Sequence, residues 1–512
     1  MWTHLAILVA CFAYVHGANP CKLMKEQDNY YVCVCNKDYC DEIEPLGNIE
    51  GNHAAVYYST ESGKRMEKYT IEATSNRPDN NIRIHVDTRY VYQEILGFGG
   101  AFTDATGINL KAIGNDLANK IIDTYYSADK GIGYTFGRVP IASTDFSTHA
   151  YSYDDVSNDF SLSQFNLASE DHDYKIPYIK RAKQANGNIK LMATPWSAPA
   201  WMKNTGRMQG GGSLKGDFLG TYWKTYANYI VKFFEAYKNE GIDFWGLSVQ
   251  NEPNTGQWED FPWQTQYYTA EMERDFIKSL LGPALRNSNA GRNVGIIIND
   301  DNRKNLPSWP NTIIGDGDAA KYVIGTGVHW YEDGNTPVSV LTDVHNSHSD
   351  KFILNTEASC GFKANGMGEW YAAQLITDDL MDDLTNFAAG WIDWNLVLNK
   401  DGGPTFVNNN VKSNIVVNAA AGEFYKTPLF HHMAHFSKFV RPGSHRVAFD
   451  RDSSEDPWND IKAIPFLNPQ GQKVVVVINK SWNTAHDVVI EEYNKFYKIS
   501  MEKYSMATII FN

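Results

Sequence analysis

Eight short apolar runs recur through the middle of the chain, and they constrain its fold more than any other feature. Each run ends in polar or aromatic residues. Their spacing averages about 40 residues, which leaves room for a strand, its loops and a helix in every repeat. The runs are Ile95–Gly100, Tyr134–Pro140, Ile189–Pro195, Phe244–Gln250, Val294–Ile298, Tyr322–Val328, Lys351–Asn355 and Ala389–Asn395.

Helical periodicity lies between several of these runs, and Tyr371–Phe387 is one candidate helix. A second apolar stripe, with the i, i+3, i+4 spacing of one helix face, consists of Tyr226, Tyr229, Ile230, Phe233, Phe234 and Tyr237. Strands alternating with helices predict an α/β fold, a parallel (β/α)8 TIM barrel over residues 94–433. A doubly wound sheet is the alternative, but the glycine-rich stretch at 97–102 has Phe102 at the third fingerprint position.

Both ends of the chain alternate polar and apolar residues, as half-buried strands do. Asn81–Val86 shows this pattern near the start, and Lys473–Ile478 and Thr508–Phe511 are strand-like runs near the end. The sequence therefore predicts an accessory β-sandwich domain built from residues 46–93 together with residues 434–512.

The first 17 residues contain the apolar run Leu5–Tyr14, followed by small residues at Val15 and Gly17. The run is too short to span a membrane, and it predicts a secretory signal peptide over residues 1–17, although no Lys or Arg precedes it. A buried N-terminal strand is the alternative. No later stretch is long and apolar enough to form a transmembrane segment.

Four cysteines crowd into 20 residues of the N-terminal segment 18–45: Cys21, Cys33, Cys35 and Cys40. In a secreted chain, two disulfides are favoured over a metal knuckle, but three connectivities remain open. Cys360 is left over as a free thiol. Asn479-Lys480-Ser481 is a glycosylation sequon.

Charge and motif content exclude several functions. The chain has 46 basic and 60 acidic residues, a net charge of −14, and so lacks the basic footprint of a nucleic-acid-binding protein. Common zinc-protease, serine-hydrolase and nucleotide-hydrolase motifs do not occur. His431, His432 and His435 could bind a metal, but no carboxylate stands at a matching spacing. We expect these histidines to be structural, with no metal and no cofactor.

Two glutamates directly follow predicted barrel strands. Glu252 comes after the fourth run and Glu357 after the seventh. In a barrel, the carboxyl ends of the strands carry the chemistry. Two carboxyl groups facing each other are typical of glycoside hydrolysis, in which one donates a proton and the other attacks or activates water. A separation of about 5 Å would mean retention and about 6.5–9.5 Å inversion, and the sequence does not fix that distance.

Other strand ends carry side chains suited to sugars. Asn251 could bond a 2-hydroxyl, Asp104 could accept from vicinal hydroxyls, and Tyr331 could hold the nucleophile ionised. Trp196 and Trp394 offer flat faces for a pyranose ring. Each residue alone could belong to barrel packing, and their joint placement at strand ends is what points to a sugar site.

In order along the chain, these motifs resemble the glucosylceramidase type of glycoside hydrolase family 30, whose members are retaining (β/α)8 enzymes. The resemblance runs from about Cys21 to the C-terminus. It rests on Gly97–Asp104, Pro195–Lys203, Gly212–Gly216, Val249–Pro253, His329–Tyr331, Asn355–Ala358, Gly390–Asn395 and the cysteine segment Val32–Cys40.

The resemblance implies that Glu252 is the general acid/base and Glu357 the nucleophile. It implies that Tyr331 contacts the nucleophile. It also implies that Cys21 pairs with Cys33 and Cys35 with Cys40. The residues that would bind the glucosyl unit are Asp104, Trp196, Asn251, Trp394 and, less securely aligned, Asn409.

The implied substrate is glucosylceramide at a membrane surface, with a saposin-like activator, an anionic-lipid requirement and a lysosomal location. Departures from vertebrate members at Trp263, Ser359 and Thr405-Phe406 leave both glutamates intact but bear on the aglycone and on trafficking. Two alternatives follow: a secreted family-30 enzyme acting on a β-1,6-glucan or β-xyloside, and a non-catalytic carbohydrate-binding protein.

Overall fold

The computed structural model describes residues 18–27, 29–79, 81–361, 366–452, 456 and 458–512. The predicted signal peptide, residues 1–17, lies outside the described residues. Within the described ranges, no helix has the length and apolar character that a membrane crossing requires.

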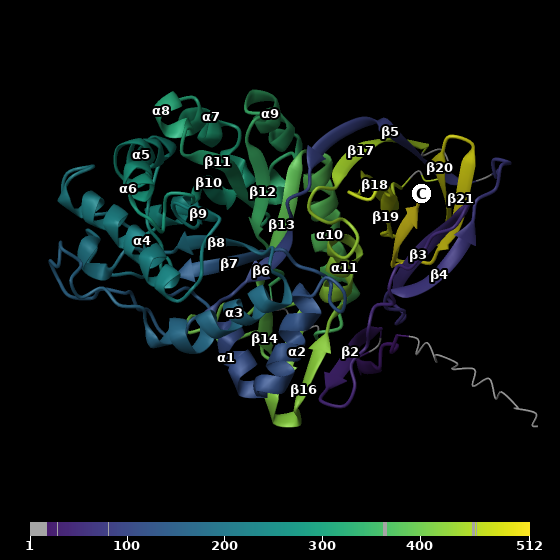
Figure 1. The fold of residues 1–512 in the computed structure, drawn as a ribbon, viewed down its shortest axis with the longest axis horizontal. Coiled ribbons are helices and arrows are strands. Elements are labelled where there is room, and N and C mark those ends of the chain that lie inside the picture. Colours follow the sequence, from purple (N-terminus) through teal and green to yellow (C-terminus); the bar gives the residue numbers. More distant parts are fainter. Residues whose placement is uncertain (1–17, 28, 80, 362–365, 453–455, 457) are drawn as a thin grey trace, which may run out of the picture.

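Eight parallel strands close into a barrel at the centre of the molecule (Figure 1). The barrel is closed because the last strand pairs with the first, with Gly390 opposite Gly97. Each of the eight predicted runs overlaps one strand, which confirms the predicted barrel. The strands are β6 (Gly97–Ala101), β7 (Phe136–Ile141), β8 (Lys190–Pro195), β9 (Gly246–Ser248), β10 (Gly295–Asn302), β11 (Val323–His329), β12 (Phe352–Glu357) and β13 (Ala388–Asn395).

Helices follow the barrel strands, as the periodicity predicted, and the apolar stripe from Tyr226 to Tyr237 is buried on one of them, α4. The helix predicted at 371–387 ends earlier, at Thr385, because Phe387 has a φ of 74°, which is outside the helical region. The helices are α1 (Asp104–Ile113), α2 (Asn115–Tyr126), α3 (Ile176–Ala185), α4 (Thr221–Asn239), α5 (Ala270–Phe276), α6 (Gly282–Asn287), α7 (Ser308–Ile314), α8 (Gly317–Ala320), α9 (Ser339–Ser347), α10 (Trp370–Thr385) and α11 (Pro428–Ser437).

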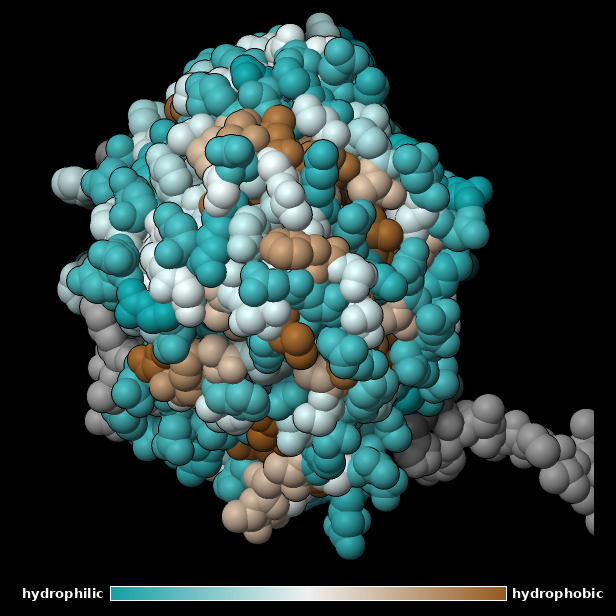
Figure 2. Space-filling model, turned by 90° about the vertical axis from the view of Figure 1, so that its left-hand side faces the viewer, coloured by the Kyte–Doolittle hydropathy of each residue, from teal (hydrophilic) through white to brown (hydrophobic). Residues whose placement is uncertain are grey.

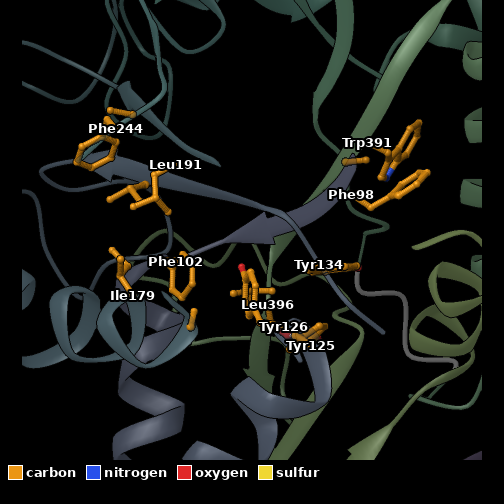
Figure 3. Close-up of a cluster of buried hydrophobic side chains, with 14 of the residues drawn as sticks. Phe98, Phe102, Tyr125, Tyr126, Tyr134, Ile179, Leu191, Phe244, Trp391 and Leu396 are labelled. Atoms are coloured by element: carbon orange, nitrogen blue, oxygen red, sulfur yellow. The ribbon is translucent and has the colours of Figure 1, made fainter. Parts of the chain in front are cut away.

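Aromatic rings fill the space between the barrel and its first helices (Figure 3). Phe102 and Tyr126 stack with their ring centroids 5.7 Å apart. A Cβ on Gly99 would lie 2.3 Å from the backbone oxygen of Phe136, so the glycine lets β6 and β7 approach closely. The glycine-rich stretch therefore serves barrel packing.

The two chain ends form one β domain, as predicted, and its strands belong to a single nine-stranded sheet. A bridge between Thr74 and Phe496 joins its two edges, so the sheet folds over an apolar core that includes Ile84 and Val477. In spatial order the strands are β21 (Lys495–Met501), β20 (His486–Glu492), β5 (Ile82–Glu94), β17 (His445–Asp452), β18 (Ile461–Leu467), β19 (Lys473–Asn479), β22 (Ser505–Phe511), β3 (His53–Thr60) and β4 (Glu67–Glu72).

The N-terminal segment is part of a third sheet. Its strands β1 (Leu23–Gln27) and β2 (Tyr30–Asn36) join strands that follow the barrel: β16 (Glu423–Lys426), β15 (Ile415–Asn418) and β14 (Val397–Asn399). The segment 18–45 is thus tied by backbone hydrogen bonds to residues 397–426.

Both implied disulfides are present in this segment, Cys21–Cys33 and Cys35–Cys40, so a metal knuckle is excluded. Cys360 is unpaired and buried, and burial raises the pKa of its thiol to about 12.

Two of the three histidines of α11 contact hydroxyl groups on other elements. The ring of His435 lies 2.9 Å from the hydroxyl oxygens of both Ser59 and Thr508, and His432 lies 2.7 Å from that of Thr377. Burial lowers the pKa of His435 to about 3, so this ring is neutral. Through these contacts α11 links the barrel to the sandwich.

The fold argues against a glycan on Asn479, the predicted glycosylation site. Asn479 is 1% exposed on β19. Its amide nitrogen, the atom that would carry the sugar, donates to the backbone oxygens of Thr484, Met501 and Glu502 at 2.9, 3.3 and 2.9 Å. A glycan has no room there in the folded chain, because Asn479 is the last residue of β19 and its amide is buried.

The face at the left of Figure 1 shows hydrophobic residues in small groups separated by hydrophilic ones (Figure 2). This is the pattern expected where amphipathic helices turn their apolar stripes toward the barrel and their polar sides outward.

Candidate active site

A cavity of about 440 Å³ contains residues that follow the barrel strands. Both predicted catalytic glutamates and five of the six predicted sugar contacts line it. Its lining consists of Asp145, Trp196, Asn251, Glu252, Thr255, Trp258, Phe261, Trp263, Asn302, Tyr331, Glu332, Glu357, Ser359, Gly361, Trp394, Asn409 and Val411.

The two glutamates face each other across this cavity. Glu357 is the last residue of β12, and Glu252 follows β9 with a φ of 43°, in the left-handed region. The backbone nitrogen of Glu252 donates to the backbone oxygen of Asp300 at 2.9 Å. This bond helps to hold the unusual conformation of Glu252. One carboxylate oxygen of each glutamate lies within 4.8 Å of the other.

Two donors hold the carboxylate of Glu357. The hydroxyl of Tyr331 donates to Oε1 at 2.8 Å, and the guanidinium of Arg138 contacts Oε2. Burial raises the pKa of Glu357, and the positive charges of Arg138 and His329 limit that rise.

Arg138 is fully buried and connects several site residues. It donates to Asp300 Oδ2 at 2.9 Å and to Asn251 Oδ1 at 2.8 Å. Burial alone would raise the pKa of Asp300, but Arg138 and His329 hold it well below its usual range.

Burial alone would lower the pKa of His329, but its bonds to Asp300 and Glu252 raise it to about 10. The imidazolium donates to Glu252 Oε1 at 3.1 Å and to Asp300 Oδ1 at 3.0 Å. His329 thus connects the carboxylate of Glu252 to that of Asp300, which Arg138 also contacts.

Aromatic faces and amides complete the cavity. The rings of Trp196 and Trp394 stack with centroids 5.1 Å apart, and the guanidinium of Arg138 lies 4.9 Å from the first and 5.4 Å from the second. Asn409 donates to Asp145 Oδ2 at 2.8 Å. Burial and the charge of Glu357 raise the pKa of Asp145 to about 7.

The structure does not bring Asp104 into the cavity, which corrects its predicted position. Asp104 opens α1 and is 2% exposed. Its carboxylate accepts from Ser147 at 2.5 Å and Tyr151 at 2.9 Å and lies 3.4 Å from Lys175 Nζ. These bonds hold it beneath the loop that carries Asp145, and Asp145 is the aspartate that lines the cavity.

Three central residues escaped the sequence analysis: Arg138, Asp145 and Asp300. Asp300 follows the fifth apolar run just as the glutamates follow theirs, so the strand-end rule applied to that run would have found it. Arg138 interrupts an apolar strand, and a charge in that position must have buried partners. Asp145 lies in a loop and carries no such signal.

Comparisons with known proteins agree with this architecture. The chain matches the glycosyl hydrolase family 30 TIM-barrel domain over residues 95–440 and the glycosyl hydrolase family 30 beta sandwich domain over residues 443–509. Putative glucosylceramidase 4 of Caenorhabditis elegans is 47% identical over 516 residues, with 99% of this chain and 98% of that protein covered.

Lysosomal acid glucosylceramidase of Mus musculus is 39% identical over 480 residues, with 93% of this chain and 92% of that protein covered. The crystal structure of SrfJ from Salmonella typhimurium superposes with a TM-score of 0.82 at 26% identity, covering 90% of this chain and 99% of that one. With both domain models matched and the barrel closed around a pair of glutamates, the chain belongs to glycoside hydrolase family 30.

Proposed function

We propose that this glycoside hydrolase converts glucosylceramide to glucose and ceramide with retention of configuration, Glu252 acting as acid/base and Glu357 as nucleophile. The observation that carries the mechanism is the approach of the two carboxylates, whose oxygens lie within 4.8 Å. Retaining enzymes hold their carboxyl groups about 5–5.5 Å apart, too close for an intervening water.

In the first step, an oxygen of Glu357 attacks the anomeric carbon while Glu252 gives its proton to the glycosidic oxygen. The carbon–oxygen bond to ceramide breaks, and ceramide leaves as an alcohol. Tyr331 and Arg138 support Glu357 by bonding one carboxylate oxygen each, which fixes its orientation and stabilises its charge.

In the second step, Glu252 takes a proton from water, and the water oxygen attacks the anomeric carbon of the glucosyl-enzyme. Glucose leaves, and Glu357 is again ionised while Glu252 is again protonated. Each step uses only side chains of this chain and water, with no cofactor.

The charges around the glutamates suit this cycle. The cations Arg138 and His329 contact the carboxylates of Asp300 and Glu357. The formal charges of these four groups therefore sum to zero. With Glu252 protonated, as an acid must be, the whole cluster is formally neutral. A neutral buried cluster avoids the large cost of an unpaired charge.

The glucosyl unit would lie against Trp196 and Trp394, with Asp145 and Asn409 as hydroxyl partners. The oxygen of Asn251 accepts from Arg138, which leaves its amide N–H groups to donate to a sugar 2-hydroxyl. That bond strengthens in an oxocarbenium-like transition state.

The aromatic residues Trp258, Phe261 and Trp263, which we name the aromatic wall, line the same cavity. They suit an apolar aglycone, and the similarity to proteins named glucosylceramidase supports ceramide. Because this substrate is membrane-bound, the enzyme would act at a bilayer surface. It would require anionic lipid and a saposin-like activator there. The mouse relative's name supports a lysosomal location.

The test is hydrolysis of short-chain fluorescent glucosylceramide in anionic vesicles at mildly acidic pH by wild type, Glu357→Gln and Glu252→Gln. We expect no turnover with Glu357→Gln and a loss of about 10²-fold or more with Glu252→Gln. Glu252→Gln should form the glucosyl-enzyme from dinitrophenyl β-glucoside at a near-normal rate, because that leaving group needs no proton.

If the wild type cleaves a β-1,6-glucan or a β-xyloside but not glucosylceramide, the lipid substrate is wrong. In that case the carboxylate mechanism stands only if Glu357→Gln is inactive on the new substrate. Binding of glucosides without turnover of any of them would instead indicate a non-catalytic protein.

A further inference from the structure

Lys203 is a fully buried lysine whose three donors are all used on backbone oxygens. Its Nζ donates to the oxygens of Met208 at 3.0 Å, Gly210 at 2.9 Å and Thr265 at 2.6 Å. No carboxylate accompanies it in these bonds, so the ammonium is held by carbonyl dipoles alone.

These oxygens belong to two segments that follow neighbouring barrel strands, residues 203–216 after β8 and residues 254–266 after β9. Backbone bonds continue the junction: Gly210 donates to Trp263 at 2.9 Å and Gly211 to Trp258 at 2.8 Å. The ammonium therefore lies at the junction that sets the backbone position of two members of the aromatic wall.

The aromatic wall itself is a continuous set of rings. Trp258 and Phe261 stack with centroids 6.2 Å apart, and Phe261 meets Trp263 edge-on at 4.6 Å. Trp258 is 45% exposed, so the wall runs from the cavity to the surface. It reaches outward from the glutamates, where the part of the substrate beyond the glycosidic oxygen must lie.

A buried ammonium is expensive, because it loses its hydration. Burial, together with the charge of Arg207, lowers the pKa of Lys203 to about 7. A methionine would occupy the same space without this penalty. Packing alone therefore gives no reason for a lysine here, whereas joining three carbonyls from two segments does.

We propose that Lys203 is a positioning residue that fixes the aromatic wall and thereby sets the preference for an apolar aglycone. The proposal rests on the proposed β-glucosidase activity of the same cavity. Lys203 touches neither glutamate, so it acts on the aglycone only through the wall.

A shift of these two segments can also displace Glu252. Thr255 Oγ1 lies 2.5 Å from Thr265 Oγ1 and donates to the backbone oxygen of Glu252 at 2.7 Å. The rate on one substrate would then mix two effects. The test therefore uses a ratio, kcat/KM for octyl β-glucoside divided by kcat/KM for methyl β-glucoside. Both leaving groups are alkyl alcohols, so changes in acid catalysis and in the folded fraction cancel.

We expect Lys203→Met to lower this ratio about tenfold. The fall should come from a higher KM for octyl β-glucoside. The matched control is Lys175→Met. Lys175 is equally buried but lies 3.4 Å from Asp104 and 3.3 Å from Asp171, away from the aromatic wall. We expect the control to lose stability and keep the wild-type ratio.

An unchanged ratio in Lys203→Met would overturn the proposal, and so would an equal fall in Lys175→Met. If Lys203→Met does not fold, Lys203→Arg is measured, because a planar guanidinium cannot meet the same three oxygens; a wild-type ratio there also overturns the proposal. Failure of wild type on glucosylceramide, with both alkyl glucosides cleaved, would refute only the lipid substrate.

Discussion

The hydroxyl of Tyr331 donates to Oε1 of Glu357 across 2.8 Å, and Arg138 contacts the other oxygen of the same carboxylate. Both oxygens of the proposed nucleophile are thus engaged before substrate arrives. Burial and the charge of Glu357 raise the pKa of Tyr331 well above its ordinary value, so its hydroxyl remains a donor at any working pH.

Removing that donor should slow the reaction without unfolding the protein. We expect Tyr331→Phe to lower kcat by about 10- to 100-fold, the worth of a hydrogen bond to a charged group. The measurement is kcat on an aryl β-glucoside alongside the thermal midpoint. A wild-type kcat would show that Tyr331 does not support the nucleophile.

Loss of Arg138 should affect both stability and catalysis. Arg138→Met leaves the buried carboxylate of Glu357 without its bonded cation and that of Asp300 with His329 alone, which should cost about 3–5 kcal/mol of unfolding free energy and abolish turnover. Because Arg138 holds the pKa of Asp300 low, this contribution is present above the unfolded pKa of about 3.9 and is lost as pH falls below it.

The loss of stability in Arg138→Met should therefore be larger near neutral pH than in acid. Denaturant unfolding of wild type and variant at several pH values measures it. A difference that stays constant across pH would contradict the assigned ion pairs.

Replacing Asp145 or Asp104 by asparagine should change the stability of the protein in opposite directions. The pKa of Asp145 is raised to about 7, so its contribution to stability is present below about pH 4 and lost as pH rises through 7. Asp145→Asn should therefore melt above wild type at neutral pH and match it in acid, while losing affinity for glucosides.

Asp104→Asn should destabilise the protein, because Lys175 loses a buried partner, and should keep the KM for glucosides. Thermal scans at two pH values with KM measurements separate the two variants. If KM rises in Asp104→Asn but not in Asp145→Asn, the sequence-based prediction that Asp104 binds the glucosyl unit would be restored.

The buried amide of Asn479 predicts that this sequon is empty. Intact mass and peptide mapping of protein secreted from a eukaryotic host should show an unmodified Asn479. Asn479→Asp should lower the unfolding free energy by at least about 2 kcal/mol, since the amide's three backbone acceptors lose their donor. A glycan on Asn479 in folded protein would contradict the structure of this strand.

Local patterns predicted much of this protein because they follow from rules that act over a few residues. Apolar runs at regular spacing indicated eight strands, period-2 alternation indicated the sheet at both ends, and a glutamate after a strand indicated chemistry at the barrel rim. The family came from the order of several motifs together, and the disulfide pairing was implied only by the resemblance to that family.

The tertiary structure decided what depends on distance between remote residues. It placed Asp145 in the cavity in place of Asp104, buried Asn479, joined β2 to β16, and put Arg138 between Asp300 and Glu357. Periodicity shows which face of an element is buried. It does not show which buried polar groups meet, because such groups find their partners across the fold, as Arg138 and Glu357 do from β7 and β12.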